Sequence, residues 1–262
     1  MSGNTRTHIV RPRRICNNWR VISEDLRDAF ASTCAVVPAY NEGASITNVV
    51  RAINEHMPGS RVAVVDDGSR DDTALRAREA NALVLSLPVN LGIGGAVQTG
   101  FKFALANGYD YAIQIDGDGQ HDPSEAHHLI SELLADHADI VIGSRWLGRG
   151  DYVAPRNRRY GMKFLEFLVS WKAASHFTDT TSGFRALNRR ALTLFAEHYP
   201  SDYPEVESII LARHHGLRVK EVPVSMKPRE HGTSSIRGYK TLYFMVRITM
   251  VIMLGVMNTD NS

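Results

Sequence analysis

The sequence predicts an α/β protein with a mostly parallel central sheet flanked by helices. From Thr33 onwards, short apolar runs alternate with segments of helical periodicity. The runs are apolar throughout, which indicates strands that are buried on both faces, as in a parallel sheet. A repeated order of strand and helix is typical of a sheet covered by helices on both sides.

Five apolar runs predict the first strands of this sheet. They are Cys34–Val37, Val62–Val65, Leu83–Leu85, Tyr111–Asp116 and Ile140–Ile142. Pro38 is expected to end the first of them. The pattern loosens after Arg145, and a further strand is expected at Leu217–Val224.

Helical patterns lie before and between these strands. The expected helices are Glu24–Phe30, Ile46–Ile53, Asp72–Asn81, Gly94–Asn107, Pro123–Asp136, Arg156–Ser175 and Glu205–His215. In the second of them, apolar residues at i, i+3, i+4 and i+7 form one buried face, and Ser45 is the expected cap. Pro123 suits the start of a helix.

Composition describes an ordinary soluble globular protein. Of the 262 residues, 44% are apolar and 22% are charged, and the formal charge of +2 gives no indication of a nucleic-acid partner. Cys16 and Cys34 make no disulfide framework, so a cytoplasmic setting is expected. The N-terminus lacks the apolar segment of a secretory signal.

Three regions are predicted: a basic leader at 1–32, a single domain at 33–235 and an apolar tail at 236–262. The leader has five arginines and no acidic residue among its first twenty. A second basic cluster comprises Arg145, Arg149, Arg156, Arg158, Arg159 and Lys163. Basic clusters face solvent or anions, and an anionic membrane or a phosphate is the sharper possibility.

The tail is apolar from Tyr243 to Met257 but is interrupted by Arg247. Its uncharged part is shorter than the ~20 residues that cross a bilayer. We therefore expect a buried or membrane-interfacial helix here.

The stretch from Tyr111 to Pro123 organises the predicted site. A buried strand ends at Asp116, and Asp118 follows one glycine later. Two carboxylates at this spacing can direct oxygens at one hard cation, Mg²⁺ or Mn²⁺, which takes its other ligands from water and substrate phosphates. The alternative is an ordinary Asp-Gly turn after a strand.

Polar loops follow the other predicted strands as well. In parallel sheets ligands bind beyond the carboxyl ends of the strands. One edge is therefore expected to gather Pro38–Glu42, Asp66–Ser69, Asp116–Asp118 and Gly143–Arg145.

Two of the loops have more than one interpretation. Asp66–Ser69 fits either a loop that accepts hydrogen bonds from a nucleoside or a capped turn. Gly92 and Gly94 do not complete a dinucleotide fingerprint, and we expect the glycines to permit close approach of a ligand at the start of a helix.

Six motifs occur in a fixed order along the chain: P-A-Y-N-E, V-V-D-D-G-S-x-D-x-T, N-L-G-x-G-G-A, D-G-D-G-Q-H-D-P, G-S-R and T-S-G-F-R. In this order they resemble family 2 glycosyltransferases of the GT-A fold, in the branch of dolichyl-phosphate mannose synthase and bacterial polyprenyl-phosphate sugar synthases. The resemblance spans about Thr33 to Ser235. It implies a UDP- or GDP-linked sugar donor, a divalent metal ion, inversion at the anomeric carbon and a polyprenyl phosphate acceptor.

The resemblance also implies site residues. Those for the donor are Pro38, Tyr40, Glu42, Asp67, Gly94, Asp116 and Gln120. Those for the metal ion and the diphosphate are Asp116, Asp118 and Gln120. Those for the acceptor phosphate are Arg145, Arg156 or Arg158, Ser182 and Arg229.

The segment from Arg229 to Ser235 resembles a closing loop that usually ends in lysine. Ser235 stands at that position, and Arg237 and Lys240 are the candidates to replace the missing cation. The expected location is the inner face of the cytoplasmic membrane, where the protein would bind peripherally.

The acceptor decides whether a base is needed. A lipid phosphate is already anionic and needs positioning, which Arg145 would supply, whereas a saccharide hydroxyl needs a carboxylate base. Asp179 is the candidate base, or else a turn cap. His121 is expected to contribute little to metal binding, because histidine suits softer metals than Mg²⁺.

Two further functions remain as alternatives. A nucleotidyltransferase also uses paired carboxylates on an α/β sheet, and a non-catalytic module could bind nucleotide sugars without transferring them. Metal-dependent hydrolysis of the sugar donor by the purified protein would separate an enzyme from such a module, and unchanged turnover in Asp118→Ala would remove the metal role.

Overall fold

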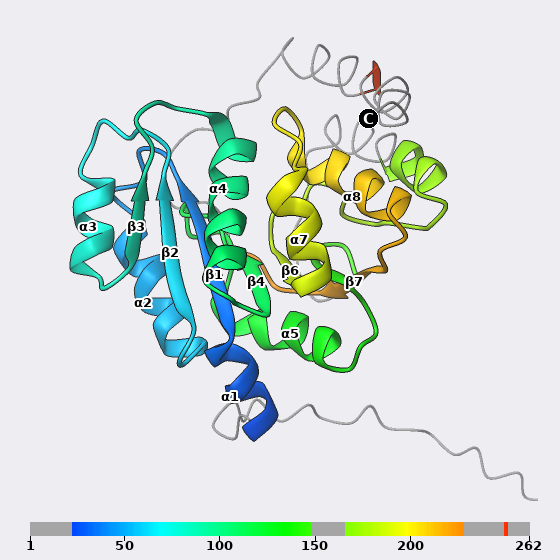
Figure 1. Cartoon of the computed structure of the whole chain (residues 1–262), viewed down its shortest axis with the longest axis horizontal. Coiled ribbons are helices and arrows are strands. Elements are labelled where there is room, and N and C mark those ends of the chain that lie inside the picture. The colour runs from blue at the N-terminus through cyan, green and yellow to red at the C-terminus, as the bar shows by residue number, and fades with distance from the viewer. Residues whose placement is uncertain (1–22, 148–165, 228–248, 251–262) are drawn as a thin grey trace, which may run out of the picture.

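The computed structural model describes residues 23–147, 166–227 and 249–250. One seven-stranded sheet has the order β3-β2-β1-β4-β6-β5-β7 (Figure 1). The strands are β1 (Thr33–Ala39), β2 (Arg61–Asp66), β3 (Leu83–Ser86), β4 (Tyr111–Gln114), β5 (Ile140–Ser144), β6 (Arg185–Asn188) and β7 (Val219–Pro223). Only β6 runs against its neighbours, so the predicted mostly parallel sheet is confirmed.

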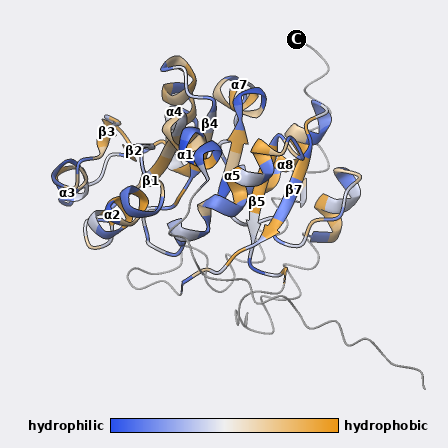
Figure 2. Ribbon diagram, turned by 90° about the horizontal axis from the view of Figure 1, so that it is seen from below, coloured by the Kyte–Doolittle hydropathy of each residue, from blue (hydrophilic) through white to orange (hydrophobic). Residues whose placement is uncertain are grey.

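Helices cover both faces of the sheet. They are α1 (Glu24–Ala31), α2 (Ile46–His56), α3 (Thr73–Glu79), α4 (Gly92–Ala106), the 3₁₀ turn η1 (Pro123–Glu125), α5 (Ala126–Leu134), α7 (Arg189–Glu197) and α8 (Pro204–His214). Residues 166–172 are also helical. Figure 2 shows apolar residues concentrated in the strands and the inner sides of the helices.

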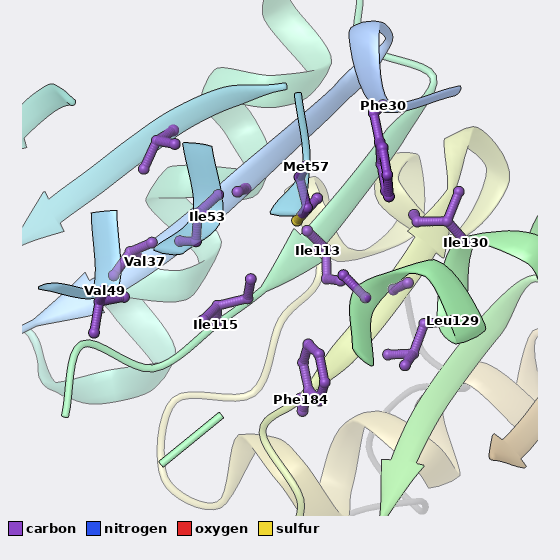
Figure 3. Close-up of a cluster of buried hydrophobic side chains, with 14 of the residues drawn as sticks. Phe30, Val37, Val49, Ile53, Met57, Ile113, Ile115, Leu129, Ile130 and Phe184 are labelled. Carbon is purple, nitrogen blue, oxygen red and sulfur yellow. The ribbon is translucent and has the colours of Figure 1, made fainter. Parts of the chain in front are cut away.

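Each face of the sheet has its own hydrophobic core. Figure 3 shows the first, where Phe30 of α1, Ile53 of α2 and Leu129 of α5 pack against β1 and β4. The second lies under α4, α7, α8 and residues 166–172. Strand β1 serves both, because Val37 faces the first core and Val36 the second, as the period of two requires.

Pro38 does not end β1, contrary to the prediction. The strand continues to Ala39, and Pro38 pairs with Val65 of β2. The carbonyl of Pro38 points to the other side, where it accepts from the Gly117 amide at 3.3 Å, and there β4 has already ended. Proline has no amide hydrogen to donate. On this side of β1 the paired part of β4 has already ended, so the sheet loses no hydrogen bond at Pro38.

Other local predictions need correction. Strand β4 ends two residues before Asp116, and the helix expected from Pro123 to Asp136 divides into η1 and α5. Ser45 precedes α2 but makes no cap hydrogen bond, and its hydroxyl donates instead to the Gly117 carbonyl at 2.7 Å. Strand β6 and helix α7 were not predicted at all.

Several predictions concern residues that lie outside the described ranges. They include residues 1–22 of the leader, Arg156, Arg158, Arg229 and nearly all of the apolar tail. Among the described helices none is both long and apolar enough to cross a bilayer. Cys34 is buried, and burial raises the pKa of its thiol to about 12, so it is an inert packing residue.

Candidate active site

The carboxyl ends of β1, β2, β4 and β5 lie on one edge of the sheet. Strands β1, β2 and β4 are parallel, and β5 has the same direction because β6 opposes both β4 and β5. The predicted gathering of four polar loops at one edge is confirmed. Strand β6 starts at this edge, so the segment Thr180–Phe184 before it joins them.

The aspartates at the end of β4 are held by separate donors. The Asp116 carboxylate accepts from the Gln114 side-chain amide at 3.1 Å, and its side chain is 33% exposed. The Asp118 carboxylate accepts from the Gln120 backbone amide at 3.0 Å and is buried. The two side chains therefore have fixed positions on either side of Gly117.

The buried side chain of His121 holds the Asp116–Asp118 loop in place. Its Nδ1 accepts from the Asp116 backbone amide at 3.0 Å, and its ring stacks on Phe184 at 5.1 Å. Since Nδ1 is occupied as an acceptor, the neutral ring carries its proton on Nε2, 3.7 Å from the Asp116 carboxylate. These contacts position the aspartates, which agrees with the minor metal role expected for His121.

The donor set at this loop fits a magnesium-type ion. Among the residues with described coordinates, no cluster of three or more His, Cys, Asp or Glu side chains is arranged as a complete metal cage. Mg²⁺ is commonly bound by one or two carboxylates plus water and substrate phosphates, so a pair of aspartates suffices. Gly183 packs against Asp116, and a Cβ there would come within 3.1 Å of an Asp116 oxygen.

The loops after β1 and β2 are fastened to each other. The Asn41 amide donates to the Ser69 hydroxyl at 2.9 Å, and the Arg70 amide donates to the Asn41 side chain at 2.8 Å. The Gly43 amide donates to Asp71 at 3.0 Å. Burial acts to raise the pKa of Asp71, but hydrogen bonds from Thr73 and Gly43 outweigh it and lower the pKa.

The residues of these loops that were predicted to bind the sugar donor differ in how exposed they are. Tyr40 is 44% exposed beyond the end of β1, and Glu42 is half-buried. Pro38 is buried within the strand. Tyr40 and Glu42 are therefore accessible to a nucleoside, and Pro38 can contribute only through packing.

The Asp67 carboxylate is hydrogen-bonded within the protein. Its two carboxylate oxygens accept from the backbone amides of Leu91 at 2.7 Å and Gly92 at 2.9 Å, and only 3% of the residue is exposed. Burial raises the pKa of Asp67 despite these bonds. The carboxylate supports the start of α4, and its predicted contact with the nucleoside remains a prediction.

The Cα of Gly94 packs against protein backbone, and its predicted contact with the donor remains a prediction. A Cβ at this position would lie 2.4 Å from the Pro200 carbonyl oxygen and 2.7 Å from the Ser201 Cα. Glycine is required because α4 packs directly on the backbone that leads into α8.

Arg145 and Asp179 form a bidentate ion pair. Arg145 Nε and one terminal nitrogen each donate to a different Asp179 oxygen at 2.7 Å, and the Arg145 backbone amide donates at 3.1 Å. The Asp179 side chain has no exposed surface, whereas that of Arg145 is 18% exposed. A carboxylate held in this way is not presented to a substrate hydroxyl, so Asp179 is not the predicted base but the support of Arg145.

Ser182 is also turned inward. It is 1% exposed, and its hydroxyl accepts from the Phe184 amide at 3.3 Å. Its carbonyl accepts from Arg185 at 2.8 Å, and Arg185 also donates to the Ser208 hydroxyl and the Glu205 carbonyl, each at 2.6 Å. Ser182 is therefore not placed to meet an acceptor phosphate, and it helps to join the loop to α8.

Three supporting residues escaped the sequence analysis. Gln114 orients Asp116, and Arg185 holds the Thr180–Ser182 turn. Glu221 of β7 accepts from the backbone amides of Thr178 and Asp179, directly before this turn. Arg185 stands in the T-S-G-F-R motif, but its burial could not be read from the motif. Gln114 is an isolated polar residue in an otherwise apolar strand, which is the only signal for it in the sequence. Glu221 stands next to Lys220 in a strand with two charged residues, so nothing in the sequence distinguished it.

The match to known proteins agrees with this arrangement. The model of the family described as glycosyl transferase family 2 matches residues 34–195, which contain all four strand ends of the site. The chain belongs to glycosyltransferase family 2. It is therefore an enzyme of glycosyl transfer, and the nucleotidyltransferase and the non-catalytic module are set aside.

Relatives within family 2 cover most of the chain. The undecaprenyl-phosphate mannosyltransferase of Micrococcus luteus is 31% identical over 220 residues, which are 78% of this chain and 86% of that protein. The UDP-N-acetylglucosamine–dolichyl-phosphate N-acetylglucosaminyltransferase of Methanococcus voltae is 29% identical over 239 residues, 82% of this chain and 95% of that protein.

Solved structures confirm the GT-A fold of the family. Glucosyl-3-phosphoglycerate synthase from Mycobacterium tuberculosis, in complex with Mn²⁺, UDP and phosphoglyceric acid, has a TM-score of 0.68 and 23% identity. The match covers 91% of this chain and 83% of that one. A structure of the same enzyme contains Mg²⁺ and UDP.

Proposed function

We propose that this chain transfers a sugar from a nucleotide diphosphate sugar to a polyprenyl phosphate, with inversion at the anomeric carbon. The observation that carries the proposal is the position of two opposite charges at one edge of the sheet. The Asp116–Asp118 pair follows β4, and Arg145 follows β5, with only β6 between the two strands. Two strand spacings are roughly 10 Å, which leaves room for a sugar between donor and acceptor phosphates.

The donor half of this site would stabilise the leaving group. Asp116 and Asp118, with Gln120 beside them, would hold Mg²⁺ or Mn²⁺ against the diphosphate. The bound ion would neutralise negative charge as the nucleoside diphosphate departs. Tyr40 and Glu42 are the exposed and half-exposed groups available to the nucleoside.

The acceptor half favours a phosphate over a hydroxyl. A hydroxyl acceptor needs a base, and the one candidate that the sequence offered, Asp179, is bound to Arg145 on both oxygens. A phosphate needs a positioned cation, for which the fork of an arginine is suited. The relatives from M. luteus and M. voltae are named for transfer to undecaprenyl phosphate and dolichyl phosphate, respectively.

The test is a transfer assay with the full chain and Mn²⁺. UDP- and GDP-linked radiolabelled sugars are supplied with either undecaprenyl phosphate or a soluble saccharide. Label that becomes extractable into organic solvent supports the proposal. Transfer to the saccharide alone would replace it with the hydroxyl-acceptor function, and release of free sugar alone would refute both.

A lipid acceptor requires contact with a membrane surface at the inner face of the cytoplasmic membrane. The helical residues 166–172 carry Phe167, 68% exposed, and Trp171, 59% exposed, one turn apart. The opposite side of the same turns packs into the core through Leu168 and Val169. Two large aromatic side chains on the outer face suit an interfacial helix.

The membrane contact is tested by sedimentation with vesicles that contain anionic lipid. Phe167→Ser combined with Trp171→Ser should reduce the bound fraction several-fold. The matched control is Leu75→Ser, because Leu75 of α3 is 56% exposed outside this helix. Equal binding of the double variant and the control would exclude this helix as the membrane contact.

A further inference from the structure

Glu221 of β7 serves a loop that is remote from it in sequence. Its carboxylate accepts from the backbone amides of Thr178 and Asp179, each at 2.7 Å, and from the Thr178 hydroxyl at 3.1 Å. Residues 178–179 belong to no helix or strand. Glu221 therefore supplies the hydrogen-bond acceptor that a paired strand would otherwise give these two amides. Its removal would leave both amides without this acceptor.

The loop that Glu221 holds is the support of Arg145. Asp179 binds the Arg145 guanidinium through both oxygens at 2.7 Å, and the Thr181 hydroxyl accepts from the same guanidinium at 2.9 Å. From the other side, the Thr178 hydroxyl meets the Ser144 hydroxyl at 2.7 Å. The loop is thus hydrogen-bonded to Ser144, the last residue of β5, and to Arg145, which follows it.

The sheet register makes this chain of contacts short and rigid. Strand β7 pairs with β5, and Glu221 is opposite Ile142, three residues before Arg145. The path from Glu221 through Asp179 to Arg145 begins on a strand and ends on the loop after the adjacent strand. Glu221 is partly buried, and a carboxylate withdrawn from water is costly unless it is hydrogen-bonded; here three donors satisfy it. Burial still raises the pKa of Glu221.

We propose that Glu221 is a positioning residue for glycosyl transfer: it fixes the Thr178–Asp179 backbone, and Asp179 in turn orients the Arg145 guanidinium toward the acceptor. The proposal rests on the proposed function, in which Arg145 meets the acceptor phosphate. Glu221 itself touches no substrate. It acts through the geometry of Arg145 alone, so it should affect the acceptor step and leave the donor half unchanged.

The test compares Glu221→Gln with the wild type and with Glu132→Gln as matched control. Glu132 also anchors β7, through Lys220 at 2.7 Å, but it does not contact the 178–179 loop. Glutamine keeps the size of the side chain but faces one backbone N–H with a second donor. We expect kcat/KM for undecaprenyl phosphate to fall about 10- to 100-fold in Glu221→Gln, as for a misplaced positioning group, with nucleotide affinity within twofold. The control should match the wild type.

A second readout does not depend on activity. With ¹⁵N-labelled arginine, the Nε–H resonance of Arg145, assigned through Arg145→Lys, should shift in Glu221→Gln. The Nε–H of Arg185, which donates to the Ser182 carbonyl, is the internal reference and should stay in place. If Glu221→Gln does not fold, Glu221→Asp is measured instead, since it keeps the charge but falls one methylene short of the loop.

Each outcome decides the proposal. Asp179→Asn should reproduce the loss, and the double variant should be no worse than the poorer single variant, because the two residues act in series. An unmoved Arg145 resonance, or equal losses of donor binding and transfer, would overturn the positioning role. If the wild type transfers nothing to undecaprenyl phosphate, the proposed function fails, and the Arg145 resonance still decides whether Glu221 positions this side chain.

Discussion

Arginine serves two purposes around the segment that precedes β6. Arg185 is buried and uses its guanidinium to join backbone carbonyls of the turn to α8. Arg145 pairs with a buried carboxylate but keeps part of its side chain at the edge of the sheet. Charge alone therefore does not distinguish the buried structural arginine from the one proposed to meet the acceptor; the difference lies in what each guanidinium is bound to.

At the residue scale, Asp118→Ala should abolish sugar transfer without unfolding the protein. Asp118 lies in a loop outside both hydrophobic cores, so stability should change little. Loss of charge stabilisation at the leaving group should cost at least about 100-fold in kcat. Transfer rate, melting temperature and Mn²⁺ binding by paramagnetic resonance are the measurements.

The matched control for Asp118→Ala is Asp110→Ala, an exposed aspartate directly before β4. It removes the same charge at the opposite end of the strand. Undiminished turnover in Asp118→Ala, or an equal loss in both variants, would remove the assigned metal role.

At the scale of elements, glycine lets α4 touch its neighbours. Gly100 leaves space for Val36 of β1, where a Cβ would come within 2.2 Å of a valine methyl group. Gly94 does the same for the backbone at Pro200 and Ser201. These close contacts fix α4 against both the sheet and the segment that enters α8.

Gly94→Ala should therefore destabilise the fold through overpacking, by about 1–3 kcal/mol. Neither the helix nor the backbone at 200–201 can easily yield to the added methyl group. Urea unfolding compared with Lys102→Ala, on the exposed side of α4, measures the effect. A more stable Gly94→Ala protein, as expected from helix propensity alone, would contradict the close packing.

Asp139 joins the amino-terminal end of β5 to two other elements. It accepts from the Arg218 amide at 2.7 Å and from the Asn188 side chain at 2.9 Å. Burial acts to raise the pKa of Asp139, but hydrogen bonds from Arg218 and Asn188 outweigh it and hold the pKa below its ordinary value of 3.8. The charged form is therefore favoured by folding.

A lowered pKa in the folded state stabilises the protein above the ordinary pKa, and the contribution disappears as pH falls through the folded-state pKa. Asp139→Asn should thus lower the free energy of unfolding by about 2 kcal/mol at neutral pH. The difference from the wild type should shrink below pH 3.8. Urea titrations across this range test the sign, and a difference independent of pH would reject it.

At the scale of the whole molecule, nucleotide and metal ion should stabilise the protein together. At a ligand concentration of 100 times Kd, binding to the native state adds about 2.7 kcal/mol. The melting temperature should rise by several degrees with a UDP- or GDP-sugar and Mn²⁺, and chelation with EDTA should remove most of the rise. An equal rise in EDTA would show that the nucleotide binds without the ion.

Much of this architecture could be predicted from the sequence, because local patterns determine it. Apolar runs gave the parallel strands, and the rule for their carboxyl ends brought the Asp116 and Arg145 loops together. What escaped depends on contacts between distant residues. Strand β6 has only four residues and begins with a buried arginine, and no local pattern shows that Asp179 is paired with Arg145 or that Glu221 holds its loop.

The single reversed strand also divides the edge of the sheet that bears the candidate site. Strands β3, β2, β1 and β4 form one parallel block that bears the loops assigned to the nucleotide, and β5 with β7 forms another that bears Arg145. Strand β6 lies between these two blocks. Under the proposed function, changes in the segments attached to β5 and β7 would alter which acceptor is used and leave the nucleotide half intact, so evolution or an engineer could exchange acceptors by rebuilding one of the two blocks.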